Sequence, residues 1–132
     1  MSTTIQATEV IDTLVAASLS SVNVLFGNSD DSKLLKGSLP FVKESVEFTD
    51  ISQTRLNEST NRRVYGKVLL FVYVKEGTGN GARNAIIQAV SDTLTCKSVS
   101  GVTLQGLDIV ASGNKNSWAV TALSIPFHYH KL

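Results

Sequence analysis

The strongest pattern in the chain is a run of alternating apolar residues near its middle. Between Val64 and Lys75, most even positions carry valine or leucine, and the odd positions include tyrosine, leucine and phenylalanine. Side chains of a strand point alternately to its two faces, so the run predicts a strand that is apolar on both faces. Such a strand is central and covered twice, or is covered once by its own fold and once by a partner.

A glycine-rich loop and a helix are predicted directly after this strand. Three glycines lie between Gly77 and Gly81, which favours turns over a continued ladder. Small and apolar residues then recur at the spacing of one narrow helical face, which can lie close to a sheet. The residues of this face are Ala82, Ala85, Ile86, Ala89, Val90, Thr93 and Leu94.

A long amphipathic helix is predicted near the start of the chain, over residues 4–25. Hydroxyl groups at positions 2–4 can cap its first turn, and the pair Gly27-Asn28 can end it. The residues of its apolar stripe are Ala7, Val10, Ile11, Leu14, Val15, Leu19, Val22 and Phe26.

Three further strands complete the predicted fold. Residues 39–49 alternate between apolar and polar, as in an antiparallel strand with one wet face. In the next strand, residues 102–111, the apolar phase shifts at Gly106 and predicts a bulge. The last strand spans residues 117–129, and Pro126 near its end predicts an edge position or a strand terminus.

The predicted element order is therefore α-β-β-α-β-β. This order indicates an α+β fold, with two helices packed on one face of a mostly antiparallel four-stranded sheet. The chain has 132 residues and no repeat or linker-like stretch, so residues 1–132 are expected to form a single domain.

Net charge, the length of apolar segments and the cysteine count argue against several classes of protein. The net charge of +1 gives no general attraction to nucleic acid or to an anionic membrane. No segment approaches the ~20 apolar residues of a membrane span, and the first residues lack the features of a signal peptide. The single cysteine, Cys96, excludes a disulfide framework within the chain and is expected to be a packed thiol. A soluble protein of a reducing cytosol is expected.

Two motifs suggest ligand chemistry, and neither is complete. Gly77–Ala82 fits the phosphate-binding pattern G-x-G-x-x-A, but a helix and two strands precede it and no acid lies about 20 residues later. A small phosphate-ligand-binding α+β domain remains the less favoured alternative. His128 and His130 have a spacing that can share a metal, but no third ligand is indicated. No catalytic motif is present, so we expect no enzyme activity, cofactor or metal.

Among the charged residues, a group of arginines is the best candidate for a contact with a partner. They can contact phosphate, form ion pairs between subunits, or remain solvated loop charges. The arginines are Arg55, Arg62, Arg63 and Arg83, and the acidic residues that can pair with them across subunits are Glu58, Glu76 and Asp92.

The order of elements and several short signatures resemble the tail terminator proteins of long-tailed bacteriophages and prophages, such as the minor tail protein U family. An amphipathic helix precedes Leu39-Pro40-Phe41-Val42, and a long polar loop precedes Arg63-Val64-Tyr65-Gly66. Gly-x-Gly and a helix follow, and then Gly101-Val102-Thr103-Leu104 and the segment from Trp118 to Phe127. The resemblance covers nearly the whole chain.

This resemblance implies a non-enzymatic virion protein, assembled in the cytoplasm of a bacterial host and located at the head-proximal end of the tail. It implies a homo-hexameric ring that stops polymerisation of the tail tube and presents a surface to head-completion proteins. The implied partners are the major tail tube protein and a head-completion or neck protein. DNA would pass through the ring without sequence-specific binding, and no membrane is involved. Another head–tail connector, neck or minor tail protein is the alternative.

The resemblance also implies where contacts lie. The loop Asp50–Asn61 with the arginines that follow it is expected to contact the tube or a neighbour, and Ser112–Asn116 is expected to contact the ring. The arginines near that loop can instead face the lumen. The candidate interface or lumen residues are Arg55, Glu58, Arg62, Arg63, Glu76, Arg83, Asn114 and Lys115.

Overall fold

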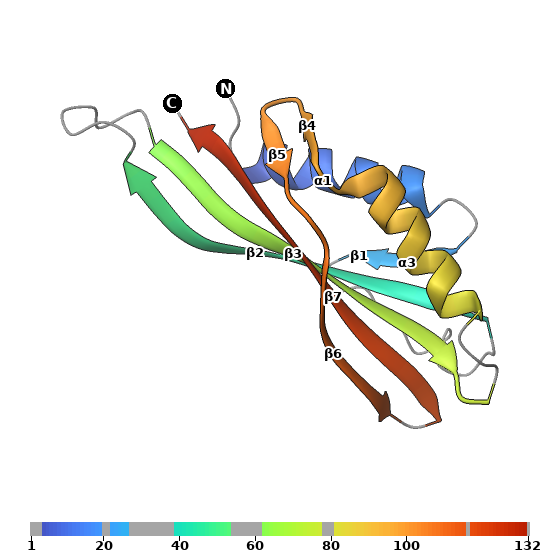
Figure 1. The fold of residues 1–132 in the computed structure, drawn as a ribbon. Helices are drawn as coiled ribbons and strands as arrows, with labels where there is room; N and C mark the ends of the chain where they lie inside the picture. Colours follow the sequence, from blue (N-terminus) through green and yellow to red (C-terminus); the bar gives the residue numbers. More distant parts are fainter. Residues whose placement is uncertain are drawn as a thin grey trace.

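The computed structural model of the chain describes residues 4–19, 22–26, 39–53, 62–77, 81–115 and 117–131. These residues form two helices and one strongly bent sheet (Figure 1). The elements are α1 (Thr4–Ser18), β1 (Asn23–Phe26), β2 (Phe41–Gln53), β3 (Arg62–Lys75), α3 (Gly81–Leu94), β4 (Lys97–Val99), β5 (Val102–Leu104), β6 (Asp108–Lys115) and β7 (Trp118–Lys131).

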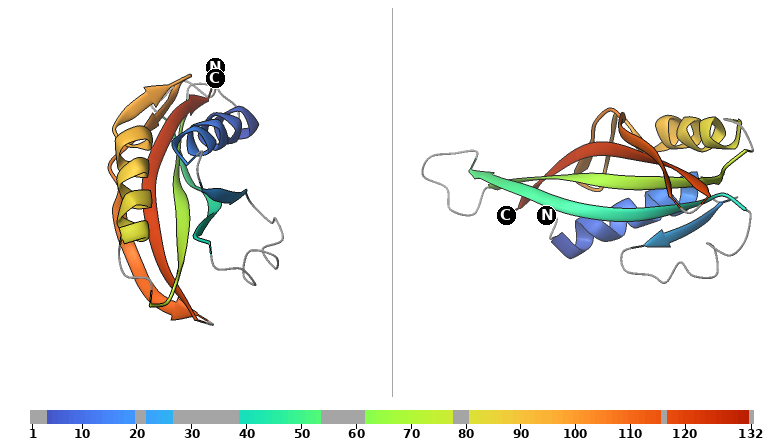
Figure 2. Two further views of the ribbon diagram at one scale, coloured as in Figure 1. Left: turned by 90° about the vertical axis from the view of Figure 1, so that its right-hand side faces the viewer. Right: turned by 90° about the horizontal axis from the view of Figure 1, so that it is seen from below.

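The predicted α+β fold with four strands in the order α-β-β-α-β-β is wrong. The described part of the chain is mostly β, with a seven-stranded mixed sheet in the order β1-β2-β3-β7-β5-β4, and β6 also pairs with β7. Among the described strands, only the pairing of β1 with β2 is parallel. The sheet curls, and β2 and β3 extend well beyond the helices (Figure 2).

The long strands β3 and β7 form the centre of the sheet. They pair without a break from Arg62 opposite Lys131 to Lys75 opposite Trp118. On its other side, β3 pairs with β2 along almost its whole length, with a register shift between Phe48 and Asp50. β3 therefore lies between two strands and carries apolar residues on both faces, with the helices packed on one of these faces.

The predicted first helix is too long, and its last part forms β1. α1 ends at Ser18, and the backbone N–H groups of Leu19 and Val22 make the last turn-like hydrogen bonds, to Val15 and Leu19 respectively. Val22 and Phe26 fit a helical stripe by their spacing of four, but with Val24 they also fit the period of a strand. Pairing with β2 provides the tertiary contact that selects the strand.

The predicted strand over residues 102–111 is divided into β5 and β6. The chain leaves the ladder at residues 105–107, and the register shift lies between Ile109 and Ala111 rather than at Gly106. Pro126 lies opposite this gap, because β5 pairs with β7 from Phe127 onward and β6 pairs only as far as Ser124. The proline therefore occupies a central strand at a point where the outer neighbour changes, and the predicted edge position is wrong.

Both helices pack on the same face of the sheet and contact each other (Figure 1). The predicted apolar face of α3 is confirmed in its larger residues, since Ile86, Val90 and Leu94 are buried. The side chains that the strands contribute to this core come from even positions of β3 and odd positions of the second half of β7. They include Val64, Val68, Leu70, Val72, Val74, Leu123, Ile125, Phe127 and Tyr129.

The opposite face of the sheet carries a smaller aromatic cluster, formed by Phe41, Tyr73 and Trp118. The rings of Phe41 and Tyr73 stack with centroids 4.5 Å apart, and Trp118 meets Phe41 edge-on at 5.1 Å. The Lys75 ammonium group lies 4.8 Å from the centroid of the Trp118 ring, within the range of a cation–π contact. The helix-free face is therefore partly apolar, with its aromatic cluster at one end.

Candidate functional site

The structure divides the predicted interface residues between two ends of the sheet. Arg62 and Arg63 begin β3, whereas Glu76 follows its last residue. A strand of 14 residues is about 45 Å long, so the arginines at the start of β3 lie far from Glu76. Arg55 and Glu58 lie outside the described residues.

The other four predicted residues come together at the far end of β3. The backbone N–H of Glu76 donates to the carbonyl of Ser117 at 2.9 Å, which holds the turn after β3 against the turn between β6 and β7. Arg83, in the first turn of α3, and Asn114 line the same hollow. Lys115 is the last residue of β6. The sequence did not indicate this grouping, since it depends on the pairing of β6 with β7.

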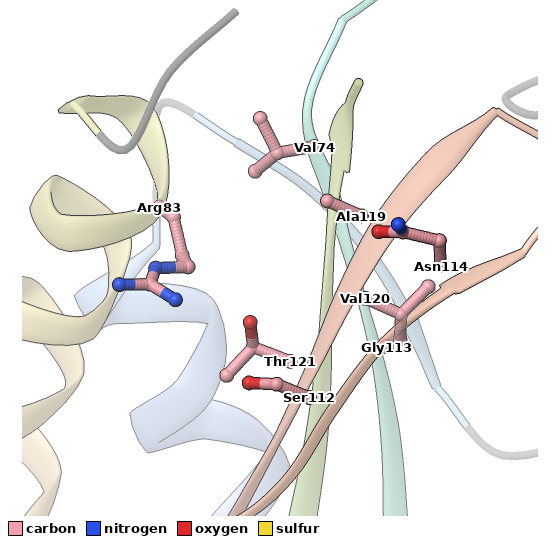
Figure 3. Close-up of a pocket in the computed structure, with 8 residues that line it drawn as sticks. All are labelled: Val74, Arg83, Ser112, Gly113, Asn114, Ala119, Val120 and Thr121. Carbon is pink, nitrogen blue, oxygen red and sulfur yellow. The ribbon is translucent and has the colours of Figure 1, made fainter. Parts of the chain in front are cut away.

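The hollow at this end lies between α3 and the β6–β7 ladder (Figure 3). Its volume is about 280 Å³. Figure 3 shows the Arg83 side chain extending from the helix, with the hydroxyl groups of Ser112 and Thr121 near each other on the strands. The lining residues are Val74, Arg83, Ser112, Gly113, Asn114, Ala119, Val120 and Thr121.

Arg83 keeps unused hydrogen-bonding capacity in this hollow. Its Nη2 donates to the Asn84 Oδ1 at 3.3 Å, but its Nε is buried and has no hydrogen-bond partner among the described residues. A guanidinium group recognises carboxylate and phosphate through paired N–H donors. With the two hydroxyls nearby, the hollow can accept an acidic side chain of a partner protein.

Strand β6 is an exposed edge of the sheet. Within the described part of the chain it pairs only with β7, and every side chain from Asp108 to Asn114 is exposed. Two large apolar side chains, Ile109 and Val110, are 56% and 57% exposed. An open edge of this kind presents unpaired backbone N–H and C=O groups to another strand.

A second hollow, of about 270 Å³, lies on the helix-free face beside the same strand. It is lined by Phe71 and Tyr73 of β3, residues 111–114 of β6, and Val120 and Ala122 of β7. Residues 112–114 of β6 therefore line both hollows, one on each face of the sheet. The predicted contact segment Ser112–Asn116 coincides with this part of the edge, as far as the structure describes it.

A pair of carboxyl groups, one buried and one half-buried, lies between α1 and β2. Glu44 is only 3% exposed and faces Asp12 of α1. Burial, with the hydrogen bond to Asp12 and the charge of Asp12, raises the pKa of Glu44 to about 9. The sequence analysis did not single out Glu44, although strand alternation places it between Val42 and Val46 on the apolar face. The Asp12 carboxyl beside it favours the protonated form of Glu44, and the two groups provide no metal site by themselves.

The other residues that the sequence suggested for ligand or metal binding do not form a site in the described part of the chain. Among the described residues, no three metal-binding side chains come together, and the ring of His128 lies 5.9 Å from that of Tyr65. Cys96 is exposed, so the expectation of a packed thiol is wrong. Residues 78–80 of the glycine loop lie outside the described part. No described helix has the length and apolar character needed to cross a membrane.

Comparison with known proteins shows similarity of fold without similarity of sequence. No protein-family model matches the chain, and no curated protein sequence is similar to it. A chain from the virion of a native gene transfer agent particle has the same fold, with a TM-score of 0.52, 15% identity and 91% of each chain covered. A second solved structure has a TM-score of 0.58 and 11% identity, and the match covers 92% of this chain and 94% of that one.

Proposed function

We propose that the chain is a structural virion protein of a bacteriophage or phage-like particle, which caps the tail tube as a hexameric ring. The observation that carries this proposal is the fold shared with a chain of the gene transfer agent virion, over 91% of both chains. The order of sequence signatures described above gives the finer assignment, that of a tail terminator. The proposed role is non-enzymatic, places the protein at the head-proximal end of the tail, and requires no cofactor.

The separation of the candidate residues supports two contacts with different roles. We assign the end that contains Glu76, Arg83, Asn114 and Lys115 to contact between ring subunits. Two kinds of contact are available there, because it combines a guanidinium group with spare donors and an open strand edge.

We assign the opposite end, where Arg62 and Arg63 begin β3, to the tube or to the lumen. The loop that contains Arg55 and Glu58 precedes these two residues and belongs to the same assignment. Basic residues at a lumen would contact passing DNA through its phosphates, independently of base sequence.

The direct test is a tube-capping assay with the major tail tube protein of the same virus. Polymerising tubes are mixed with increasing amounts of this protein, and their lengths and ends are measured by negative-stain electron microscopy. The proposal expects shorter tubes that carry a six-fold ring at one end. Binding to isolated neck or head-completion proteins, with no effect on tube length, would identify a different head–tail connector. Native mass spectrometry of the end complex gives the number of copies.

A further inference from the structure

We infer that copies of this chain join head to tail by strand pairing, with β6 of one copy adding to the outer half of β2 in the next. The inference rests on the proposed function for the closure of six copies into a ring. The pairing of two edges depends on the fold alone.

The first edge is β6, which has a strand on one side only among the described residues. It is eight residues long and carries two of the four large apolar side chains that are exposed in the described part, Ile109 and Val110. Soluble proteins normally protect such an edge with charges, prolines or a covering segment. Here the exposed apolar side chains indicate that another strand covers it.

The second edge is the outer half of β2. β1 pairs with β2 only from Phe41 to Glu44, so the described residues place no strand beside β2 from Ser45 to Gln53. Phe48 lies on this stretch and is a third exposed apolar side chain, at 38%. Its ring contacts Phe127 and Tyr129 edge-on, so it continues the core of the helix-bearing face out to the edge.

The directions of the two strands agree with this pairing. β2, β3, β7 and β6 are antiparallel in succession, so β6 runs opposite to β2 in the same sheet. A second copy that continues the sheet in the same orientation therefore presents its β2 antiparallel to β6 of the first copy, which is the more stable arrangement. Because the two edges differ, the contact is heterologous and generates a ring or a filament.

The faces of the two strands also fix a register. Ile109 pairs with Leu123 and therefore lies on the helix-bearing face, as Phe48 does through its pairing with Gly66. Placing Ile109 opposite Phe48 of the next copy brings Ala111 opposite Glu47, because the register shift between Ile109 and Ala111 omits one residue. Gly113 then lies opposite Ser45, where the free stretch of β2 ends, so residues 108–113 of β6 pair with the next copy and the last two residues extend past that stretch. Ala111 pairs with Ala122 and Glu47 with Lys67, so both face the helix-free side and the alternation of faces is preserved.

The free half of β2 lies beside the end of β3 that is remote from β6. Pairing of these edges offsets each copy along the strand direction, as strands are offset in a closed barrel. The offset lets the sheet of one copy continue into the next while the helices stay on one side of the assembly. These relations favour a second copy over an unrelated partner as the occupant of both edges.

Disulfide trapping tests the pairing directly. The variants carry Cys96→Ser, which removes the exposed native thiol, together with Ala111→Cys and Glu47→Cys. The two new cysteines face each other only across a contact between copies, within the Cα separation that a disulfide allows. Oxidation at about millimolar protein is expected to give a ladder of cross-linked dimers and higher species on a non-reducing gel. Each single-cysteine variant is expected to stay monomeric on the gel.

A matched control moves one cysteine by one residue. The pair Ala111→Cys and Val46→Cys points to opposite faces of the sheet, so its cross-linking is expected to be at least tenfold weaker. Circular dichroism and thermal melting establish that each variant is folded. Absence of the ladder in folded protein would overturn the inference, and so would dimers from Ala111→Cys alone, which would indicate pairing of β6 with itself.

The same samples separate this inference from the proposed function. A ladder from a protein that leaves tube length unchanged would support the strand pairing and reject the tube-capping role. Capping of tubes by a protein that gives no ladder would reject the strand pairing and retain the role.

Discussion

Phe127 lies directly against Gly66 on the neighbouring central strand. A Cβ atom at position 66 would lie 2.6 Å from the Phe127 Cζ and would also meet the carbonyl oxygen of Glu47. Real Cβ atoms do not make contacts of this kind, so the absence of a side chain at Gly66 is what lets the Phe127 ring cross β3 and reach Phe48.

The first prediction follows from this contact. Gly66→Ala is expected to lower the free energy of unfolding by about 1–3 kcal/mol, because the ring and the β2 backbone must both move to admit the methyl group. Chemical denaturation with a two-state fit measures the change. Gly106→Ala is the matched control, since nothing lies within 4 Å of a Cβ at that position, and it should shift stability by less than about 0.5 kcal/mol. Equal effects of the two substitutions would contradict this account of the packing.

The second prediction concerns the buried Glu44. Its pKa is raised to about 9 in the folded protein, so the folded state binds this proton more tightly than the unfolded state does between about pH 4.5 and pH 9. The associated stability is fully present below the ordinary pKa and is lost as the pH rises toward 9. Wild-type stability should therefore fall across this range.

Glu44→Gln removes the ionisation while keeping a similar shape. The variant is expected to be more stable than the wild type by about 1–2 kcal/mol at pH 8, because the wild type must take up a proton at Glu44 when it folds at this pH and the amide need not. Denaturation curves at pH 5, 7 and 8.5 provide the measurement. Glu47→Gln, at an exposed position of the same strand, should leave the pH dependence as it is in the wild type. Parallel pH profiles for Glu44→Gln and wild type would exclude a buried proton on Glu44.

The third prediction uses the single tryptophan as a reporter. Trp118 is 1% exposed within the aromatic cluster, so its fluorescence emission should be at shorter wavelength than in the unfolded chain and should follow unfolding. Trp118→Ala is expected to cost about 3–5 kcal/mol through the lost burial and the cavity. Val110→Ala, at an exposed position, should cost less than about 0.5 kcal/mol. An emission maximum typical of solvent-exposed tryptophan in the native state would contradict the buried position.

The fourth prediction separates the two ends of the sheet. Arg83→Glu is expected to weaken association between copies at least tenfold, because it reverses the charge in the hollow beside β6. Arg62 and Arg63 pair with the last two residues of β2, beyond residues 45–49 that the proposed register engages. The double variant Arg62→Glu and Arg63→Glu should therefore leave that association unchanged and weaken binding to tail tubes. Native mass spectrometry and tube co-sedimentation measure the two effects. If both variants impaired the same step, the division of contacts between the ends would be wrong.

Prediction from the sequence succeeded for elements with one long, regular apolar period. It failed where a segment fitted two periods, or where a contact between distant elements decided the structure. β3, α3 and β7 were located because long runs keep one period. β1 was lost because Val22 and Phe26 fit both a helix and a strand, and only its pairing with β2 distinguishes them. Pro126 was read as an edge signal because the gap between β5 and β6 is a property of the assembled sheet.

The candidate site was predictable only in part, for a similar reason. Asn114 and Lys115 were selected as turn residues near a contact, and the structure places them beside Arg83 and Glu76 through the β6–β7 hairpin. Glu44 could have been found, since strand alternation puts a carboxyl group between two valines of the apolar face. Its partner Asp12 lies on a different element, and no local pattern connects the two residues.

The ladder between β3 and β7 has a consequence for how the protein is made. It joins a strand from the middle of the chain to one near its end, with α3 and three short strands in between. During synthesis, β3 leaves the ribosome before β7 does, with apolar residues on both of its faces. The ladder between β3 and β7 cannot form until β7 has been made. Contacts this distant in sequence slow folding, since a large loop must close before they contribute. Newly made chains therefore pass through a period in which one edge of their most apolar strand is unpaired, and aggregation is most favoured during this period.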